Sequence, residues 1–340
     1  MFSGQMIATG TWPLEGGGSS LTALYLPELR SQASGDWGFA DLDLSYRFNA
    51  TNRGNPWRRG GRWYRAQFRF GGSDWDLRAG LQQLNFGPGR YLRALQWFDT
   101  LDPRDPLQLS NGVRGVRLKK YAANSTLQLW ALENTSALRG FEWLPGAEES
   151  PEWGGRYLLS AHGDWGATVH NRKIRVEAET GDREMETGNE WRFAADGAWD
   201  LGPGVWVEGV AIYRDLPLHR DWNQERFLTI GMDYTLSALH GLTVSGEYFG
   251  TRLGQRENPV HTVSLGAAEL RLPVTLTDQI SWIVFSDLKS GWSVSTISWQ
   301  RILDSWIVYC GWIFQSGSQP VSVPGLGLSS GILLLLVFNH

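Results

Sequence analysis

Strict alternation of apolar and polar residues recurs along almost the whole chain. In the segment "GFADLDLSYRFN" (38–49), Ala40, Leu42, Leu44, Tyr46 and Phe48 share one face, and polar residues occupy the other. A period of two is typical of a half-buried β-strand. Comparable segments lie at 62–70, 76–82, 115–120, 126–133, 155–162, 173–179, 191–199, 227–234 and 242–249. No amphipathic helix is predicted, so the fold class is all-β.

The connections between these segments alternate in length. Short turns are expected at 72–73, 122–124, 163–164, 201–204, 237–240 and 302–304, and longer polar loops near 50–61, 87–111, 135–153, 181–189, 214–225, 252–259 and 316–329. This pattern predicts one domain over residues 1–340, a closed antiparallel transmembrane barrel of about 18 strands, with 16 as the alternative. Short turns and both termini would face the periplasm, and long loops the exterior.

Composition supports a barrel in lipid. The chain contains 19 Trp and 41 Gly among 340 residues, yet its mean hydropathy is −0.29, which is too polar for a bundle of membrane helices. Trp residues recur at strand ends (Trp37, Trp63, Trp75, Trp153, Trp191, Trp199, Trp292, Trp306, Trp312), as in the aromatic girdles of outer-membrane barrels. A soluble β-sandwich is the alternative, but it would have to cover many consecutive apolar faces. We therefore expect an integral protein of a Gram-negative outer membrane whose signal peptide is removed in this chain.

Several functional classes find no support in the sequence. The net charge of −4 gives no indication of nucleic-acid binding. Cys310 is the only cysteine, so an intrachain disulfide, a thiolate zinc site and covalent haem attachment are excluded. There is no nucleophile elbow, phosphate-binding loop or zinc-protease motif, and the histidines are scattered. We predict no catalytic residues, no metal site and no cofactor. An enzyme embedded in the barrel, for example through Ser160 and His162, is the least favoured reading.

A charged constellation is the main candidate site. The inward positions of three consecutive strands carry a basic pore wall of Arg65, Arg69, Arg78, Arg117 and Lys119. The loop at 87–111 lies between the second and third of these strands, and it contains a predicted pore constriction of Arg90, Arg93, Asp99, Asp102, Arg104 and Asp105, stiffened by Pro103 and Pro106. If the loop folds into the lumen, its acids would face the basic wall and set solute selectivity. If the loop folds across the rim, ion pairs between its charges and the wall would only brace it.

Residues 79–172 carry a family resemblance. The run "GLQQLNFGPGRYLRALQWFDTLDPRDPLQLSNGVRGVRL", followed by "LQLWALEN", "GFEW" and "PEWGGRY", resembles an uncharacterised porin-like bacterial outer-membrane β-barrel family. More distantly it is similar to alginate-export and phosphate-selective porins. The resemblance implies a membrane barrel with an inserted loop. The end of the chain departs from the usual terminal aromatic residue, because Phe338 lies two residues before the end.

The sequence therefore predicts a porin-like channel for passive diffusion of small polar or charged solutes. The late strands, such as "DSWIVYCGWIF", are apolar on both faces, which predicts that part of the inner wall is packed. The alternative is a barrel that serves as a scaffold or sheath, for example in a porin–cytochrome electron conduit or an export complex. Expected partners are membrane lipid and lipopolysaccharide, a solute that the sequence does not name, a periplasmic or extracellular protein, and further copies of the chain, but no nucleic acid.

Overall fold

The computed structural model is an antiparallel β-barrel. It describes residues 1–14, 18–54, 56–177, 185–217, 219–237, 240–254, 259–317 and 330–340. The strands are β1 (Phe2–Pro13), β2 (Ser20–Gly35), β3 (Gly38–Asn52), β4 (Arg58–Gly71), β5 (Trp75–Gln82), β6 (Val113–Tyr121), β7 (Ser125–Glu133), β8 (Pro151–Ser160), β9 (Asp164–Glu177), β10 (Met185–Asp200), β11 (Gly204–Arg214), β12 (Gln224–Leu236), β13 (Leu242–Gly254), β14 (Pro259–Pro273), β15 (Asp278–Asp287), β16 (Ser293–Leu303), β17 (Trp306–Ser316) and β18 (Gly331–Asn339). A short 3-10 turn, η1 (Arg220–Trp222), precedes β12. No helix in these ranges is long and apolar enough to cross a membrane.

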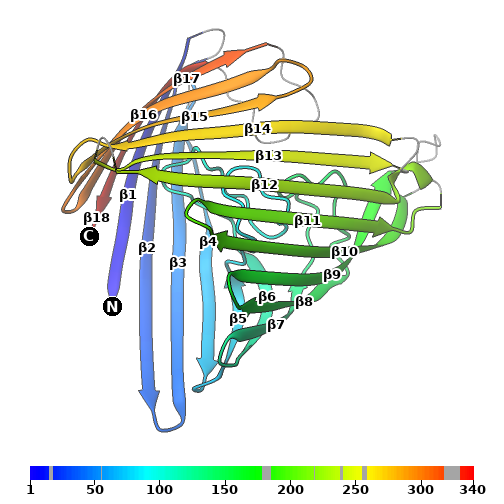
Figure 1. Cartoon of the computed structure of the whole chain (residues 1–340). Coiled ribbons are helices and arrows are strands. Elements are labelled where there is room, and N and C mark those ends of the chain that lie inside the picture. Colours follow the sequence, from blue (N-terminus) through cyan, green and yellow to red (C-terminus); the bar gives the residue numbers. More distant parts are fainter. Residues whose placement is uncertain are drawn as a thin grey trace.

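The sheet closes on itself. Each strand pairs with its neighbours in the sequence, and β1 pairs with both β2 and β18, which gives a ring of 18 strands without a crossover (Figure 1). The two termini meet at one end, where the backbone N–H of Gly4 donates to the carbonyl of His340 at 3.0 Å. Closure satisfies the backbone groups that an open edge would leave unpaired in lipid. The predicted strand number and all-β class are confirmed.

The two ends of the barrel differ in their connections. One end, here called the turn end, carries both termini and hairpin connections such as 36–37, 72–74, 122–124 and 161–163. The other, the loop end, carries the connections at 83–112 and 134–150, which are the long ones predicted. The predicted loop at 181–189 is partly wrong, because β10 already begins at Met185; residues 178–184 lie outside the described part.

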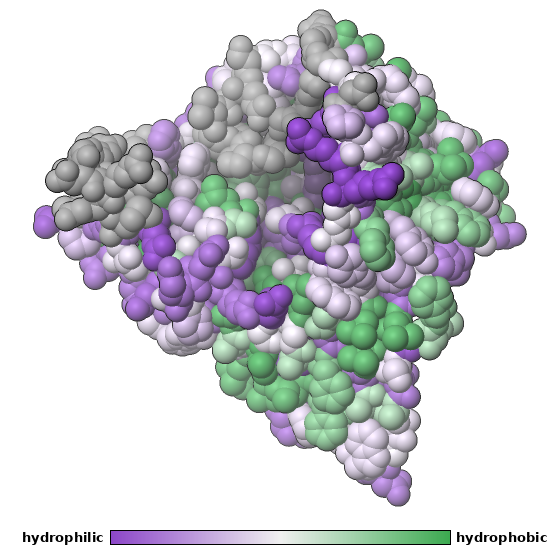
Figure 2. Space-filling view, turned by 180° about the vertical axis from the view of Figure 1, so that it is seen from behind, coloured by the Kyte–Doolittle hydropathy of each residue, from purple (hydrophilic) through white to green (hydrophobic). Residues whose placement is uncertain are grey.

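The outward face of the barrel is apolar between two belts of aromatic rings. Trp153 and Trp191 pack edge to face near the loop end with ring centres 5.3 Å apart, and Trp165 and Trp199 do so at the turn end, 4.9 Å apart. Figure 2 shows patches of apolar side chains on one outer face. Amphipathic rings favour the headgroup depth, so the two belts mark the borders of a lipid-facing band, as the sequence predicted.

Part of the inward face is also apolar. The inner side chains of β1, β2, β17 and β18 form a buried cluster of Ile7, Leu24, Leu26, Tyr309, Leu335 and Val337. Leu107 and Leu109 of the connection 83–112 pack against this cluster. The two-sided apolarity of the late strands therefore has its predicted cause, which is a packed inner wall.

A β-bulge in β4 makes the face that the sequence pattern predicts for Tyr64 wrong. Ser45 of β3 pairs with Arg65, but the next residue, Tyr46, pairs with Trp63, so Tyr64 is an extra residue in β4. The sequence pattern assigns Tyr64 to the same face as Ala66 and Phe68, whereas its side chain packs against the inner apolar cluster. A bulge shifts the phase of a strand by one residue, so both Tyr64 and Arg65 reach the interior.

We predict that the outer band is sensitive to charge at mid-depth. Leu334 lies outward near the middle of β18 and is 43% exposed, whereas Leu276 lies in the connection at the turn end. Leu334→Arg should lower the free energy of unfolding in lipid by about 2–4 kcal/mol, because arginine at the bilayer midplane loses its hydration. The matched Leu276→Arg should change it by less than about 1 kcal/mol. Equal losses, measured by denaturant titration in bilayers, would contradict the assigned depth.

Candidate functional site

The connection 83–112, here called the inserted loop, lies inside the barrel. Its buried apolar side chains join one core with the inward side chains of β7 and of β11 to β17; from the loop these are Leu84, Phe86, Tyr91, Leu92, Ala94, Leu95, Trp97 and Phe98. Since Leu107 and Leu109 contact the cluster on β1, β2, β17 and β18, the loop reaches opposite parts of the wall. Figure 1 shows its trace within the ring of strands.

Two glutamates of the wall bind the backbone of the inserted loop. Glu247 of β13 accepts the N–H groups of Arg90, Tyr91 and Leu92 at 2.6–2.9 Å and the indole N–H of Trp206 at 2.7 Å. Glu208 of β11 accepts the N–H groups of Gly89 and Leu95 at 2.7 and 3.0 Å. Buried N–H groups without a partner are costly, so these carboxylates allow the loop to leave the solvent.

The approach of Glu208 explains a glycine in the loop. Gly87 has a φ of +81°, and a Cβ there would lie 2.1 Å from Glu208 Oε1. A side chain at this position would be strained and would displace the carboxylate. The "GPG" of the sequence thus brings the backbone against the acidic wall.

Tyr91 adds a further anchor. Its hydroxyl donates to Glu269 Oε2 of β14 at 2.6 Å and also bonds with the Ser245 hydroxyl. Burial raises the pKa of Tyr91, so the phenol stays protonated and remains a donor.

The predicted constriction residues form ion pairs mainly with other residues of the inserted loop or with the barrel wall next to it. Arg93 pairs with Asp99 at 3.0 Å, and both side chains are buried. Arg104 pairs with Asp102 at 2.8 Å, where Asp102 is 38% exposed. Arg90 is half-exposed, lies over the Trp206 ring and pairs with Asp233 of β12 at 2.7 Å.

Asp105 has a different environment. Its carboxylate accepts the N–H groups of Leu107 and Leu109 at 2.9 and 3.2 Å. Burial raises its pKa, although these two hydrogen bonds and the charge of Arg47 oppose the shift. Among the constriction acids, Asp99 is thus an internal bracing residue, while Asp102 and Asp105 are the more accessible ones.

The predicted basic wall forms one continuous inner surface. Arg69, Arg78 and Arg117 stand opposite one another across β4, β5 and β6. Asp76 is fully buried among them, 3.2 Å from Arg69 and 3.5 Å from Arg78, and Lys119 lies across the ladder from it. Arg65 bonds to Gln83 and to the carbonyl of Ser110, so it ties the two ends of the inserted loop to the wall.

Buried polar atoms without a hydrogen-bond partner gather on this wall. Within the described ranges, such atoms on β3–β7 are Asp41 Oδ1, Asp43 Oδ1, Gln67 Oε1, Arg69 Nε, Asp76 Oδ1, Arg78 Nε, Gln82 Oε1, Arg117 Nε and Gln128 Oε1. Asp76 Oδ1 and Arg78 Nε lie 3.5 Å apart as an ion pair, whereas the other seven have no hydrogen-bond partner. Side-chain polar groups that the protein does not satisfy are normally satisfied by water or ligand. This surface, here called the polar wall, is therefore the part of the interior best suited to a hydrated solute.

A second long loop also enters the barrel; the sequence predicted the loop but not its position inside the barrel. Residues 134–150 pair with β9 through Gly146 and Ile174, and the Phe141 ring stacks on Phe249 of β13 with centres 4.3 Å apart. Arg139 donates to the carbonyl of Trp97, so this second loop contacts the inserted loop. Charged residues such as Arg139 and Glu142 in "RGFEW" (139–143) are too common in loops to have identified this position from the sequence.

A buried ion network holds the second loop. Glu142 pairs with Arg172 and Arg192 at 3.0 and 2.7 Å. Glu190 pairs with the same two arginines and with Arg214, which also contacts Glu225. These side chains are at most 6% exposed. Every one of these charges has an opposite partner, as a buried charge requires.

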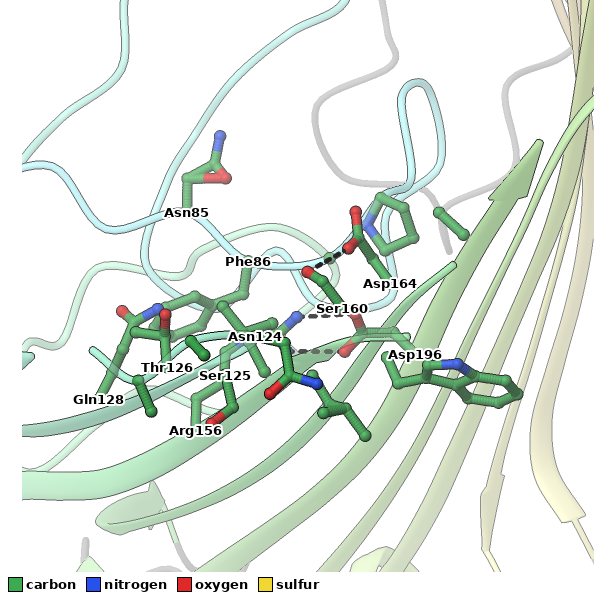
Figure 3. Close-up of a pocket in the computed structure, with 18 residues that line it drawn as sticks. Asn85, Phe86, Asn124, Ser125, Thr126, Gln128, Arg156, Ser160, Asp164 and Asp196 are labelled. Atoms are coloured by element: carbon green, nitrogen blue, oxygen red, sulfur yellow. Dashed lines mark hydrogen bonds and ion pairs between the residues drawn. The ribbon is translucent and has the colours of Figure 1, made fainter. Parts of the chain in front are cut away.

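A cavity of about 510 Å³ opens near the turn end between the inserted loop, the 122–124 turn and β7–β10. Figure 3 shows Asn85 and Phe86 of the loop on one side and Thr126, Gln128, Arg156 and Asp196 of the wall on the other. Arg156 and Asp196 form a two-bond ion pair at 2.6 and 2.7 Å. Gly166 lies beneath this pair, and a Cβ there would meet both side chains within 2.6 Å.

Comparisons with known proteins define the fold. No protein-family model and no curated protein matches the sequence. Similar solved structures are Pseudomonas aeruginosa OccK5 (OpdH), with a TM-score of 0.63 and 7% identity over 100% of this chain and 96% of that chain, and P. aeruginosa OccD3 (OpdP), with 0.62 and 8% over 100% and 90%. A mutant of Rh. blastica porin gives 0.51 and 10% over 100% and 99%.

The fold shared with these structures is a β-barrel, and the closed ring of 18 antiparallel strands confirms the predicted architecture. With its apolar outer band, the chain has the build of an integral outer-membrane protein, as predicted.

We predict that Asp99 braces the inserted loop. Asp99→Asn should lower the free energy of unfolding by about 3 kcal/mol, because it leaves the buried Arg93 guanidinium without its counter-charge. Glu133→Gln, which breaks the exposed pair with Arg114, should cost less than about 1 kcal/mol. Both are measured by denaturant titration in detergent. Similar losses for the two variants would show that the loop is not held by this pair.

Proposed function

We propose that the barrel is an outer-membrane channel, not an enzyme, through which small polar and charged solutes diffuse passively. The observation that carries the proposal is the polar wall on β3–β7, where basic side chains and partnerless polar atoms lie together inside a closed barrel. The shared fold with porins is consistent with this role. Barrels of this strand number leave room for an aqueous channel.

The inserted loop is proposed to narrow this channel. It contacts β11–β14, the apolar cluster of β1, β2, β17 and β18, and Trp130 of β7, so its bulk occupies those sides of the lumen. The solute path would then run along the polar wall, between Arg65, Arg69, Arg78, Arg117 and Lys119 and the accessible acids Asp102 and Asp105. A field between unlike charges in a narrow passage selects solutes by charge and orientation.

The polar wall has an excess of positive charge. Its five bases face Asp41, Asp43 and Asp76, and the last of these is fully buried between Arg69 and Arg78. We infer that the path favours anionic solutes over cationic ones. Electrostatic guidance of this kind raises the local concentration of the opposite charge.

Planar-bilayer recording tests the channel itself. Purified protein should give discrete conductance steps, and salt-gradient measurements should give a reversal potential on the anion-selective side. A correctly folded barrel that gives no steps would sink the channel proposal. It would favour the alternative of a scaffold or sheath for a partner, for example in an electron conduit or export complex.

We predict that Lys119 contributes to ion selectivity and that its neighbour does not. Lys119 is inward and half-buried on β6, whereas Lys120 is outward and exposed. Removing one charge about 10 Å from an ion in water changes its energy by about 0.4 kcal/mol, or roughly twofold in local concentration. Because the anion concentration falls about twofold while the cation concentration rises about twofold, Lys119→Gln should lower the anion-to-cation permeability ratio about fourfold. Lys120→Gln removes the same charge and should leave the ratio unchanged; an equal effect of both variants would place the ion path elsewhere.

A further inference from the structure

The cavity near the turn end has a lining unlike that of the basic wall beside it. Besides the apolar Phe86, Pro88, Leu158 and Leu159, its side chains are mainly amides and hydroxyls, from Asn85, Asn124, Ser125, Thr126, Gln128 and Ser160. Its volume of about 510 Å³ is within the usual range for small-molecule sites, roughly 300–1,000 Å³. The cavity is thus large enough for a small polar solute.

The buried charges of this cavity cancel one another. Arg156 is 4% exposed and gives two hydrogen bonds to Asp196 and one to Thr168. The Phe86 ring covers the Arg156 guanidinium at 5.4 Å. A guanidinium paired in this way has little capacity left for a ligand carboxylate, so the buried part of the cavity presents a neutral surface.

Gln128 is the polar group that the fold leaves unsatisfied in this lining. Its side chain is 5% exposed, and its Oε1 has no hydrogen-bond partner among the described residues. An amide offers both an acceptor and two donors, which suits a ligand that also offers both, such as a pair of neighbouring hydroxyls. Thr126 lines the cavity two residues away on the same strand face.

The position of Gln128 links the cavity to the proposed solute path. In the sheet register, Gln128 stands between Lys119 of β6 and Arg156 of β8. A solute that leaves the basic wall toward the turn end would next meet the amide and hydroxyl groups. The basic surface and the amide- and hydroxyl-lined cavity therefore lie one after the other along the same side of the barrel.

We propose that this cavity is a binding subsite for the hydroxyl groups of a monosaccharide-sized solute, either a neutral sugar or a sugar acid. The inference rests on the proposed channel function and names a substrate class for it. Gln128 and Thr126 hold the hydroxyls, and the half-buried Pro88 and Leu158 provide an apolar surface for the C–H groups of the ring. A sugar acid can in addition place its carboxylate toward Lys119.

Solute-dependent current noise tests this subsite. Glucose, glucuronate and acetate are added in turn to the bilayer chamber, and the modulation of the open-channel current is titrated. Glucose and glucuronate should both modulate the current, whereas acetate, which has no hydroxyl groups, should not do so at the same concentrations. A lower half-saturating concentration for glucuronate than for glucose identifies a sugar acid as the preferred solute. A lower half-saturating concentration for glucose identifies a neutral sugar. Modulation by acetate and glucuronate without glucose would overturn the proposal, because charge alone would then be recognised.

Two pairs of variants make the test specific. Gln128→Leu keeps the approximate size but removes the amide, and should raise the half-saturating glucose concentration about fivefold or more, as expected for lost hydrogen bonds. Gln82→Leu is the matched control, because Gln82 is equally buried on the polar wall, also has a partnerless Oε1, and does not line the cavity. Thr126→Val should also weaken glucose binding, whereas Thr296→Val on β16 should not.

The outcomes separate this inference from the channel proposal. A protein without conductance steps contradicts the channel itself. Conducting wild-type protein whose current is insensitive to glucose, or whose sensitivity falls equally in Gln128→Leu and Gln82→Leu, contradicts only the subsite. A glucose effect that falls in Gln128→Leu and Thr126→Val but persists in both controls supports it.

Discussion

The carboxylate of Glu247 is the interaction on which the interior of this barrel depends. A loop of 30 residues cannot enter a barrel unless its backbone N–H groups find acceptors there. Glu247 accepts three of them and the Trp206 indole, and Glu208 accepts two more. The loop in turn provides the hydrogen bonds that a buried carboxylate needs. These hydrogen bonds offset the cost of burying both the carboxylates and the loop backbone. They therefore fix the position of the loop on β11–β13.

The division of the lumen follows from where the loop is bound. On the side of β1, β2, β17 and β18 the wall is apolar, and Leu107 and Leu109 cover it. On β11–β14 the wall is acidic and is satisfied by the loop backbone and by Tyr91. The wall of β3–β7 keeps its charges and its partnerless polar atoms. The wall of β3–β7 therefore differs in chemistry from the sectors that the inserted loop covers.

The sequence predicted the parts of this structure that depend on local pattern. The period of two, the aromatic belts and the alternating connection lengths gave the strand number, because each is set by neighbours in the chain. The partners of the inserted loop could not be predicted. Glu208 and Glu247 look like any other inward polar residues of their strands, and they meet the loop across more than 100 residues of sequence. The sequence left open whether the acids of the loop face the basic wall or only brace the loop. Asp99 and Asp102 bond to Arg93 and Arg104, which are much closer along the chain than the basic wall. The bulge at Tyr64 was hidden for a related reason, since a single inserted residue leaves the alternation intact on either side of it.

The second loop bears on whether the constriction is fixed or mobile. Glu142 links it to Arg172 and Arg192, and separating these buried pairs would leave charges uncompensated at a cost of several kcal/mol. The same loop reaches the inserted loop through Arg139 and the carbonyl of Trp97, and Gly140 lies so close to the Gln96 carbonyl that a Cβ would be 2.4 Å from it. The inserted loop is thus held by glutamates of the wall and also by a neighbour that is itself locked by ion pairs. Movement of the inserted loop would require both sets of contacts to break together. Under the proposed channel function, selectivity would therefore come from fixed side chains and not from a gate.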